Sequence, residues 1–97
     1  MPHDERSGAE RRAEPRHTAA GQVRLRQSSP LAEPFTGQLM DVARTGFRAH
    51  HDRLSLGSGQ LVEFQMARRH GRARAVWTRI LDGKAETGFR IVAQGKD

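Results

Sequence analysis

Apolar and polar residues alternate in short segments along most of the chain, and this period of two is typical of half-buried β-strands. In the segment GQVRLRQ, Val23 and Leu25 fall on one face, while Arg24 and Arg26 fall on the other. Glycine, proline or short polar turns separate this segment from five further strands, which we expect at residues 35–42, 46–50, 60–67, 72–81 and 84–93. Strands with one apolar side must close or stack to bury that side, so the pattern predicts an all-β domain, either a small barrel or a sandwich.

The connections between these segments indicate which strands pair. Only the tripeptide ART separates residues 35–42 from residues 46–50, so these two strands should form a hairpin. The last two strands are joined by Asp82 and Gly83, a favoured two-residue hairpin turn.

The strand before that turn has conflicting face assignments. Ala73, Ala75 and Trp77 share one face, whereas Val76 and Ile80 share the other. Either both faces of this strand are partly covered or a β-bulge interrupts the alternation.

The first 17 residues form a polar arm without apolar periodicity, which we expect to be flexible in isolation. A chain of 97 residues holds one small domain. We therefore divide the chain into an N-terminal arm over residues 1–17, a β-domain over residues 18–93 and a short tail over residues 94–97.

The net charge of +6 lies in the β-domain and tail, because four arginines in the arm are matched by four acidic residues. Only Lys84 and Lys96 are lysines, and the other basic residues are arginines. The planar fork of arginine suits phosphate oxygens and guanine edges. An anionic partner and an ordinary arginine-rich surface are equally compatible with this composition.

Several functional classes are disfavoured by the residues present. The chain has no cysteine and no tyrosine, no serine in a nucleophile turn and no paired carboxylates, so we do not expect an enzyme. His50 and His51 are adjacent and would point to opposite faces of a strand, so we expect no metal site. No apolar run is long enough for a membrane span or a secretory signal, and a cytoplasmic protein without membrane contact is expected.

Two segments carry candidate binding residues. In DVARTG, the carboxylate of Asp41 could accept hydrogen bonds from the N1 and N2 edge of guanine, and Gly46 could supply a positive φ and a close backbone approach. In the arm, Arg11, Arg12 and Arg16 could bind phosphates or guanine O6 and N7. The ordinary alternatives are a capped turn and a solvated leader whose arginines are neutralised by neighbouring glutamates.

Two further features have weaker functional interpretations. The segment ARRHGRAR, residues 67–74, gathers four arginines at a hairpin tip and is either a solvated loop or a patch for a phosphate or a partner. Trp77 is either a barrel residue or a rim residue that could stack on a base.

Taken together, ERRAEPR, DVARTG, AVW and TGFRIV resemble the PilZ domain, and the resemblance extends from about Glu10 to Val92. PilZ domains are bacterial receptors for the second messenger cyclic di-GMP, with a six-stranded antiparallel β-barrel of the split-barrel type preceded by a flexible arm. Their ligand signature is RxxxR in the arm, matched here by Arg12 and Arg16, and (D/N)xSxxG in the early hairpin, matched by Asp41 and Gly46.

The resemblance implies a role for each matched residue. Arg12 and Arg16 would clamp phosphate or guanine as the arm folds onto the barrel, and Arg11 would assist. Asp41 would accept hydrogen bonds from guanine, and Gly46 would allow close approach.

The serine position of the second motif holds Ala43 in this chain. A missing hydroxyl removes a hydrogen bond worth about 0.5 to 1.5 kcal/mol, so we expect cyclic di-GMP to bind up to about tenfold more weakly than with serine. Arg44 or Thr45 could supply a substitute donor.

The function implied by the resemblance is a cyclic di-GMP receptor that orders its arm on binding and signals to an unknown downstream protein. We expect a monomer with no cofactor, no DNA partner and no membrane partner. Two alternatives stay open. One is a degenerate PilZ domain that acts as a protein–protein interaction module without binding nucleotide. The other is a general nucleic-acid-binding barrel, for which the five aromatic residues give a poor stacking surface.

Overall fold

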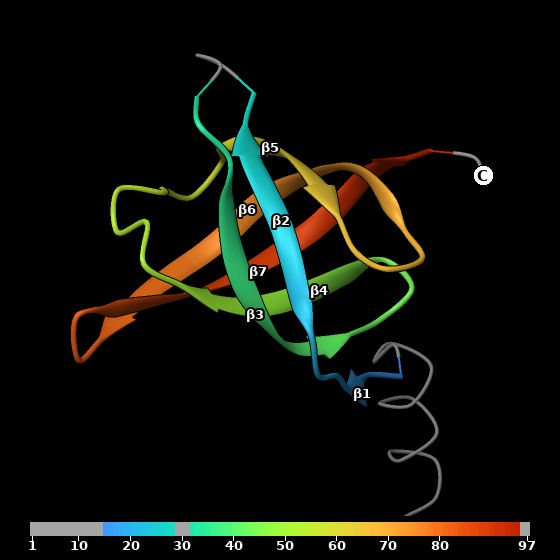
Figure 1. The fold of residues 1–97 in the computed structure, drawn as a ribbon, viewed down its shortest axis with the longest axis horizontal. Coiled ribbons are helices and arrows are strands. Elements are labelled where there is room, and N and C mark those ends of the chain that lie inside the picture. The colour runs from blue at the N-terminus through green and yellow to red at the C-terminus, as the bar shows by residue number, and fades with distance from the viewer. Residues whose placement is uncertain (1–14, 29–31, 96–97) are drawn as a thin grey trace, which may run out of the picture.

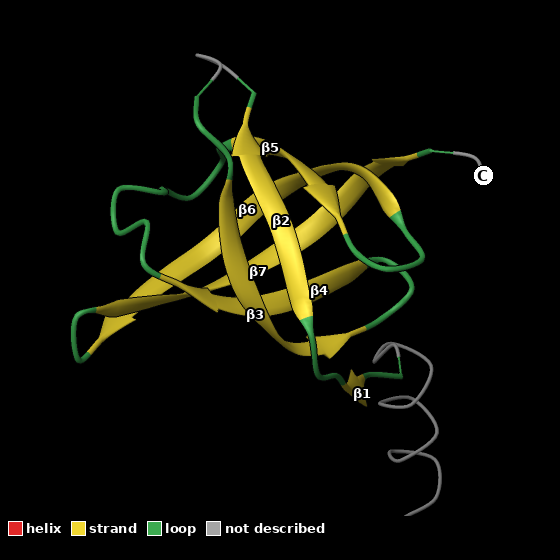
Figure 2. Cartoon of the chain, viewed as in Figure 1, coloured by secondary structure: helices red, strands yellow, loops and turns green. Residues whose placement is uncertain are grey.

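The computed structural model describes residues 15–28 and 32–95, and all of its regular structure is β (Figures 1 and 2). The predicted all-β fold is confirmed, and each of the six expected strands is present within about two residues of its expected bounds. A seventh, very short strand at the end of the arm was not expected. The strands are β1 His17–Thr18, β2 Gln22–Gln27, β3 Phe35–Val42, β4 Gly46–His51, β5 Leu61–Gln65, β6 His70–Leu81 and β7 Lys84–Gln94.

The six long strands close into an antiparallel barrel. Their order around it is β3-β2-β5-β6-β7-β4, and pairing of β4 with β3 closes the ring. The sequence pattern was compatible with a barrel or a sandwich, and the pairing of β3 with β4 shows that the fold is a barrel. β1 pairs with the end of β3 on the same side as β2, near the bottom of the barrel in Figure 1.

The barrel interior is filled by a small aromatic cluster and surrounding aliphatic residues. Phe47 lies at its centre, with its ring 4.8 Å from that of Phe89 and 5.2 Å from that of Phe64. Ala73 and Ala75 on β6 contribute small side chains, which leaves room for these rings. The other buried members of the core are Val23, Leu25, Leu39, Ala49, Leu56 and Val62.

The β6–β7 hairpin turns through the predicted dipeptide, with φ of 54° at Asp82 and 76° at Gly83. The sequence left two explanations for the mixed pattern of β6, and the register identifies a β-bulge. Ala75 pairs with Phe89 while Trp77 pairs with Gly88, so Val76 is the extra residue.

A buried polar cluster joins β4, β7 and β6 through His51, Thr87 and Thr78. The buried His51 shares a 2.7 Å hydrogen bond between its Nε2 and Oγ1 of Thr87, and Thr87 is bonded in turn to Thr78 at 2.8 Å. The Nδ1 of His51 accepts the backbone N–H of Arg53 at 3.1 Å, and burial lowers the pKa of the ring below 6.5. The neutral imidazole is therefore the form that this cluster stabilises.

Within the described residues, no helix is long and apolar enough to cross a membrane.

Candidate functional site

A β-bulge in β3 determines where Asp41 points. Leu39 pairs with Ala49 and faces the core, and Asp41 pairs with Arg48, so Met40 between them has no partner on β4. Strict alternation would place Leu39 and Asp41 on the same face. The extra residue instead turns Asp41 to the outer face, beside the guanidinium of Arg48.

The carboxylate of Asp41 is held by two arginines from different parts of the chain. Its Oδ1 accepts from Nη1 of Arg16 at 2.8 Å, and its Oδ2 accepts from Nε of Arg48 at 2.8 Å. The Asp41 side chain is only 10% exposed, whereas that of Arg16 is 49% exposed. The site is thus the nearly buried anion Asp41, bound by Arg48 and by the more exposed Arg16.

The charges of these arginines govern protonation at the site. Burial raises the pKa of Asp41, but the hydrogen bond and charge of Arg48, together with those of Arg16, outweigh it and hold the pKa below 3.8. The hydrogen bond to Asp41 in turn raises the pKa of Arg48. Asp41 is therefore an ionised acceptor at neutral pH.

β1 joins the end of the arm to this hairpin. His17 pairs with Val42 and Thr18 pairs with Asp41, and the next N–H, of Ala19, donates to the carbonyl of Met40 at 3.1 Å. This pairing places Arg16 directly in front of the carboxylate that it binds. Arg11 and Arg12, the other arm residues of the predicted site, lie outside the described residues.

Gly46 has a structural role that the sequence interpretation did not include. It is not among the described glycines with positive φ, so the expectation of a positive φ there is wrong. A Cβ at Gly46 would overlap the carbonyl oxygen of Phe89 on β7. The close approach that requires glycine is therefore made by β7, because Gly46 pairs with Arg90 at the start of the β4–β7 ladder.

Ala43 is 4% exposed and lines a hollow beside the turn, with a volume of about 340 Å³. The hollow lies between the end of the arm, the β3–β4 turn and the β5–β6 loop, and its lining residues are Pro15, His17, Val42, Ala43, Arg44 and Arg69.

Arg69 supports this turn from the β5–β6 loop. Its Nη1 donates to the carbonyl of Ala43 at 2.9 Å, and its Nη2 donates to the carbonyl of Arg44 at 2.6 Å. Within the segment of residues 67–74, Arg69 is thus part of the candidate site.

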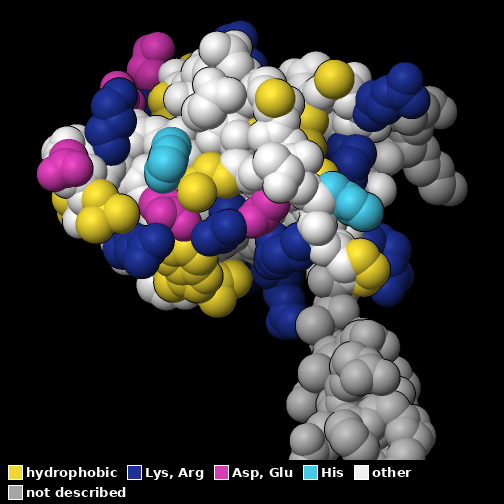
Figure 3. Space-filling view, turned by 90° about the horizontal axis from the view of Figure 1, so that it is seen from below, with side chains coloured by type: hydrophobic (Ala, Val, Ile, Leu, Met, Phe, Trp, Pro, Cys, Tyr) yellow, Lys and Arg dark blue, Asp and Glu magenta, His cyan; other side chains and the backbone are white. Residues whose placement is uncertain are grey.

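A second carboxylate continues the ionic row across the barrel. Glu86 on β7 has a side chain only 3% exposed, and it accepts from Nη1 of Arg48 at 3.1 Å and from Nη2 of Arg79 at 3.1 Å. Nε2 of His50 lies 3.7 Å from the same carboxylate. Figure 3 shows basic, acidic and histidine side chains interleaved on this face of the molecule. Arg48 is therefore shared between two nearly buried anions.

Trp77 lies at the far end of the same face. Arg48 pairs with Gly88 across β4 and β7, and Gly88 pairs with Trp77 across β7 and β6. The indole lies over this glycine, with its Nε1 only 2.5 Å from where a Cβ would be. The tryptophan is 39% exposed, so part of its ring is open to a ligand.

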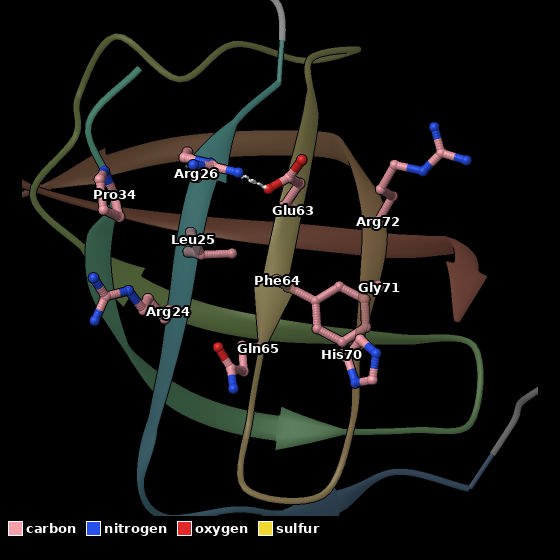
Figure 4. A pocket seen from close by; sticks show the side chains of 10 residues that line it. All are labelled: Arg24, Leu25, Arg26, Pro34, Glu63, Phe64, Gln65, His70, Gly71 and Arg72. Atoms are coloured by element: carbon pink, nitrogen blue, oxygen red, sulfur yellow. Dashed lines mark hydrogen bonds and ion pairs between the residues drawn. The ribbon is translucent and has the colours of Figure 1, made fainter. Parts of the chain in front are cut away.

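A separate hollow lies on the outer face of β2, β5 and β6 and contains none of the predicted site residues (Figure 4). Its volume is about 570 Å³, and Arg24, Arg26 and Arg72 are among the residues that line it. Arg26 is paired with Glu63, the one acidic residue in the lining.

Among the described residues, no group of three or more potential metal-ligating side chains comes together. No known family model matches the chain. No curated protein matches it either.

Proposed function

We propose that this protein is a PilZ-like receptor for cyclic di-GMP, which it binds between the arm and the β3–β4 hairpin. The observation that carries the proposal is the pair formed by Arg16 and Asp41. These residues are separated by 25 positions, belong to the two motifs that suggested the ligand, and are joined by a 2.8 Å hydrogen bond. Within the described part of the arm, residues 15–17, this contact links the two halves of the site.

The chemistry of the ligand complements these groups. Cyclic di-GMP carries two phosphates and two guanines, and each guanine has an acceptor pair on its Hoogsteen edge and N–H donors on its N1 and N2 edge. Ionised Asp41 suits the donor edge, and arginine forks suit the phosphates and the acceptor edge. Arg12, four residues before Arg16, would supply a second fork, and Arg11 would assist.

Binding at Asp41 would proceed by exchange. Both of its oxygens already accept from arginines, so a guanine edge would replace Arg16 at Oδ1 while Arg48 keeps its hold on Oδ2. The released guanidinium of Arg16 is the more exposed of the two and would turn to a phosphate or to guanine O6 and N7. Asp41 would then keep one cationic partner, Arg48.

Two other features support this binding mode. The open part of the Trp77 ring offers a stacking surface for a base at the end of the row that begins at Asp41. The hollow beside Ala43 offers space next to the hairpin, with Arg69 at its rim. Folding the arm over the ligand would change the outline of the domain, and a downstream protein would recognise that change.

Isothermal titration with cyclic di-GMP tests the proposal. The double variant Arg12→Ala/Arg16→Ala should abolish or strongly weaken binding. The matched control Arg24→Ala/Arg72→Ala removes the same charge from the separate hollow of Figure 4 and should leave the affinity within about twofold. No heat from wild-type protein at high micromolar ligand would overturn the proposal. Equal losses in both double variants would show that only net charge matters.

The interaction-module alternative gains support from Ala43 and from the arginines that already occupy Asp41. The nucleic-acid alternative gains support from Arg24, Arg26 and Arg72, which line the hollow on β2, β5 and β6. A nucleic-acid binder would show affinity that falls steeply with salt and depends on the control arginines Arg24 and Arg72.

A further inference from the structure

One strand of the barrel has an edge that no other described strand covers. β5 pairs with β6 as far as Arg74, and the backbone of Gly59 and Gln60 extends this contact only to Ala75. From Val76 to Leu81, β6 pairs with β7 alone among the described residues. The end of this hairpin projects past the rest of the barrel at the lower left of Figure 1. We refer to residues 76–81 of β6 as the free edge.

The tight turn determines which backbone groups the free edge presents. A two-residue turn makes Leu81 and Lys84 a hydrogen-bonded pair, and bonded and non-bonded pairs then alternate along the ladder. The N–H and C=O groups of Thr78 and Ile80 therefore point away from β7. The carbonyl of Val76 points the same way, since it accepts from the Oγ of Ser58 at 2.7 Å.

The side chains along the free edge are unusually apolar for their exposure. Val76 is 51% exposed, Ile80 54% and Leu81 51%, and Trp77 is 39% exposed. Single exposed apolar residues are common on protein surfaces. Four of them within six residues on an open strand edge form a surface suited to pairing with another strand.

We propose that the free edge pairs in antiparallel fashion with the free edge of a second copy of this chain, about a two-fold axis at Thr78. Hydrogen bonding between outward-facing residues allows an axis at Thr78, Arg79 or Ile80. An axis at Arg79 would set two guanidinium groups directly opposite each other. An axis at Ile80 would bring Thr78 against Asp82, a turn residue with φ of 54°.

The axis at Thr78 avoids both conflicts and joins complementary side chains. Thr78 exchanges two backbone hydrogen bonds with its own copy, and Val76 faces Ile80 of the second copy. Trp77 faces Arg79 of the second copy, an indole against a guanidinium. The ladder ends at Val76, whose carbonyl is already engaged by Ser58. This interface goes beyond the proposed ligand function and does not require it.

Sedimentation equilibrium over a wide concentration range tests the interface. The wild-type protein should self-associate to a dimer, and Ile80→Lys should weaken this dimer by about tenfold or more, because two-fold symmetry places each substitution in the interface twice. The matched control is Val92→Lys, which removes a similarly exposed (48%) apolar residue from the other end of β7. A wild-type monomer at all concentrations would overturn the proposal. A dimer that survives Ile80→Lys, or one that is lost with Val92→Lys, would overturn it too.

Cysteine cross-linking tests the axis, and the absence of native cysteine makes the result clear. Residues in a hydrogen-bonded antiparallel pair have Cα atoms about 5.5 Å apart, which matches the usual Cα separation in disulfides. Thr78→Cys should form a linked dimer rapidly under mild oxidation, and Val92→Cys should do so much more slowly. Far-UV circular dichroism of both variants verifies that the barrel is folded. Equal cross-linking rates in two folded variants would overturn the assigned axis.

Discussion

Removing the guanidinium shared by the two nearly buried carboxylates should destabilise the fold measurably. In Arg48→Ala, Asp41 keeps Arg16 and Glu86 keeps Arg79, but each carboxylate loses a close charged donor. Hydrogen bonds to charged groups contribute about 1.5 to 3 kcal/mol each. Arg48 is itself 36% exposed, so solvent screening reduces these values by about half. We expect the free energy of unfolding to fall by about 2 kcal/mol.

Urea denaturation at pH 7 measures this change, and a thermal melt should show a Tm lower by about 10 °C for a domain of this size. Two further variants test how the charge and the guanidinium geometry of Arg48 contribute to stability. Arg48→Lys keeps the charge but cannot bond both carboxylates in the same way, and should lie between wild type and alanine. Adding Asp41→Asn to Arg48→Ala should restore part of the loss, because it removes a nearly buried carboxylate that has lost one of its two charged partners. A loss below about 0.5 kcal/mol in Arg48→Ala, the range of ordinary surface substitutions, would show that Arg48 does not stabilise the two carboxylates.

Three other predictions follow from the hairpin and the polar cluster. Gly46→Ala should destabilise the barrel by about 1 to 3 kcal/mol in urea titrations, since its Cβ meets backbone that cannot move freely; an unchanged midpoint would contradict the close approach of β7. Ala43→Ser should tighten cyclic di-GMP binding up to about tenfold by calorimetry, and equal or weaker affinity would count against the missing hydroxyl. Burial lowers the pKa of His51 below 6.5, so the unfolded chain binds this proton more readily, and Tm should be constant above about pH 6.5 and fall as the pH decreases below it. His51→Gln should flatten that dependence, and a wild-type Tm that is level down to about pH 5 would exclude it.

The sequence was a good guide to the strands because each has a clear local pattern. Alternating residues in β2 and the Asp82–Gly83 turn predict their structures directly. The mixed pattern of β6 indicated either a bulge or two partly covered faces, and the bulge at Val76 is the one present. Closure of the barrel depends instead on pairing between distant strands, which no short segment encodes.

The candidate site was less predictable because it depends on irregularities. The bulge at Met40 has no distinctive residue, yet it decides that Asp41 faces Arg48 and not the core. Arg69 comes from a loop that composition alone assigned to solvent or to an unspecified patch. The sequence singled out Gly46 but did not show why glycine is needed there. The strand that approaches it, β7, lies more than 40 residues later in the chain.

The order in which the barrel closes has a consequence for how the protein folds. The β3–β4 hairpin is local, so Asp41 and Arg48 can meet early, on the timescale of microseconds typical of hairpins. Glu86 reaches Arg48 only when β7 docks on β4, a step that must close a loop of nearly 40 residues. In a folding intermediate with β3 and β4 paired, Arg48 would therefore bind Asp41 but not yet Glu86. Arg48→Ala should both slow folding, through the lost early contact with Asp41, and speed unfolding, through the lost late contact with Glu86.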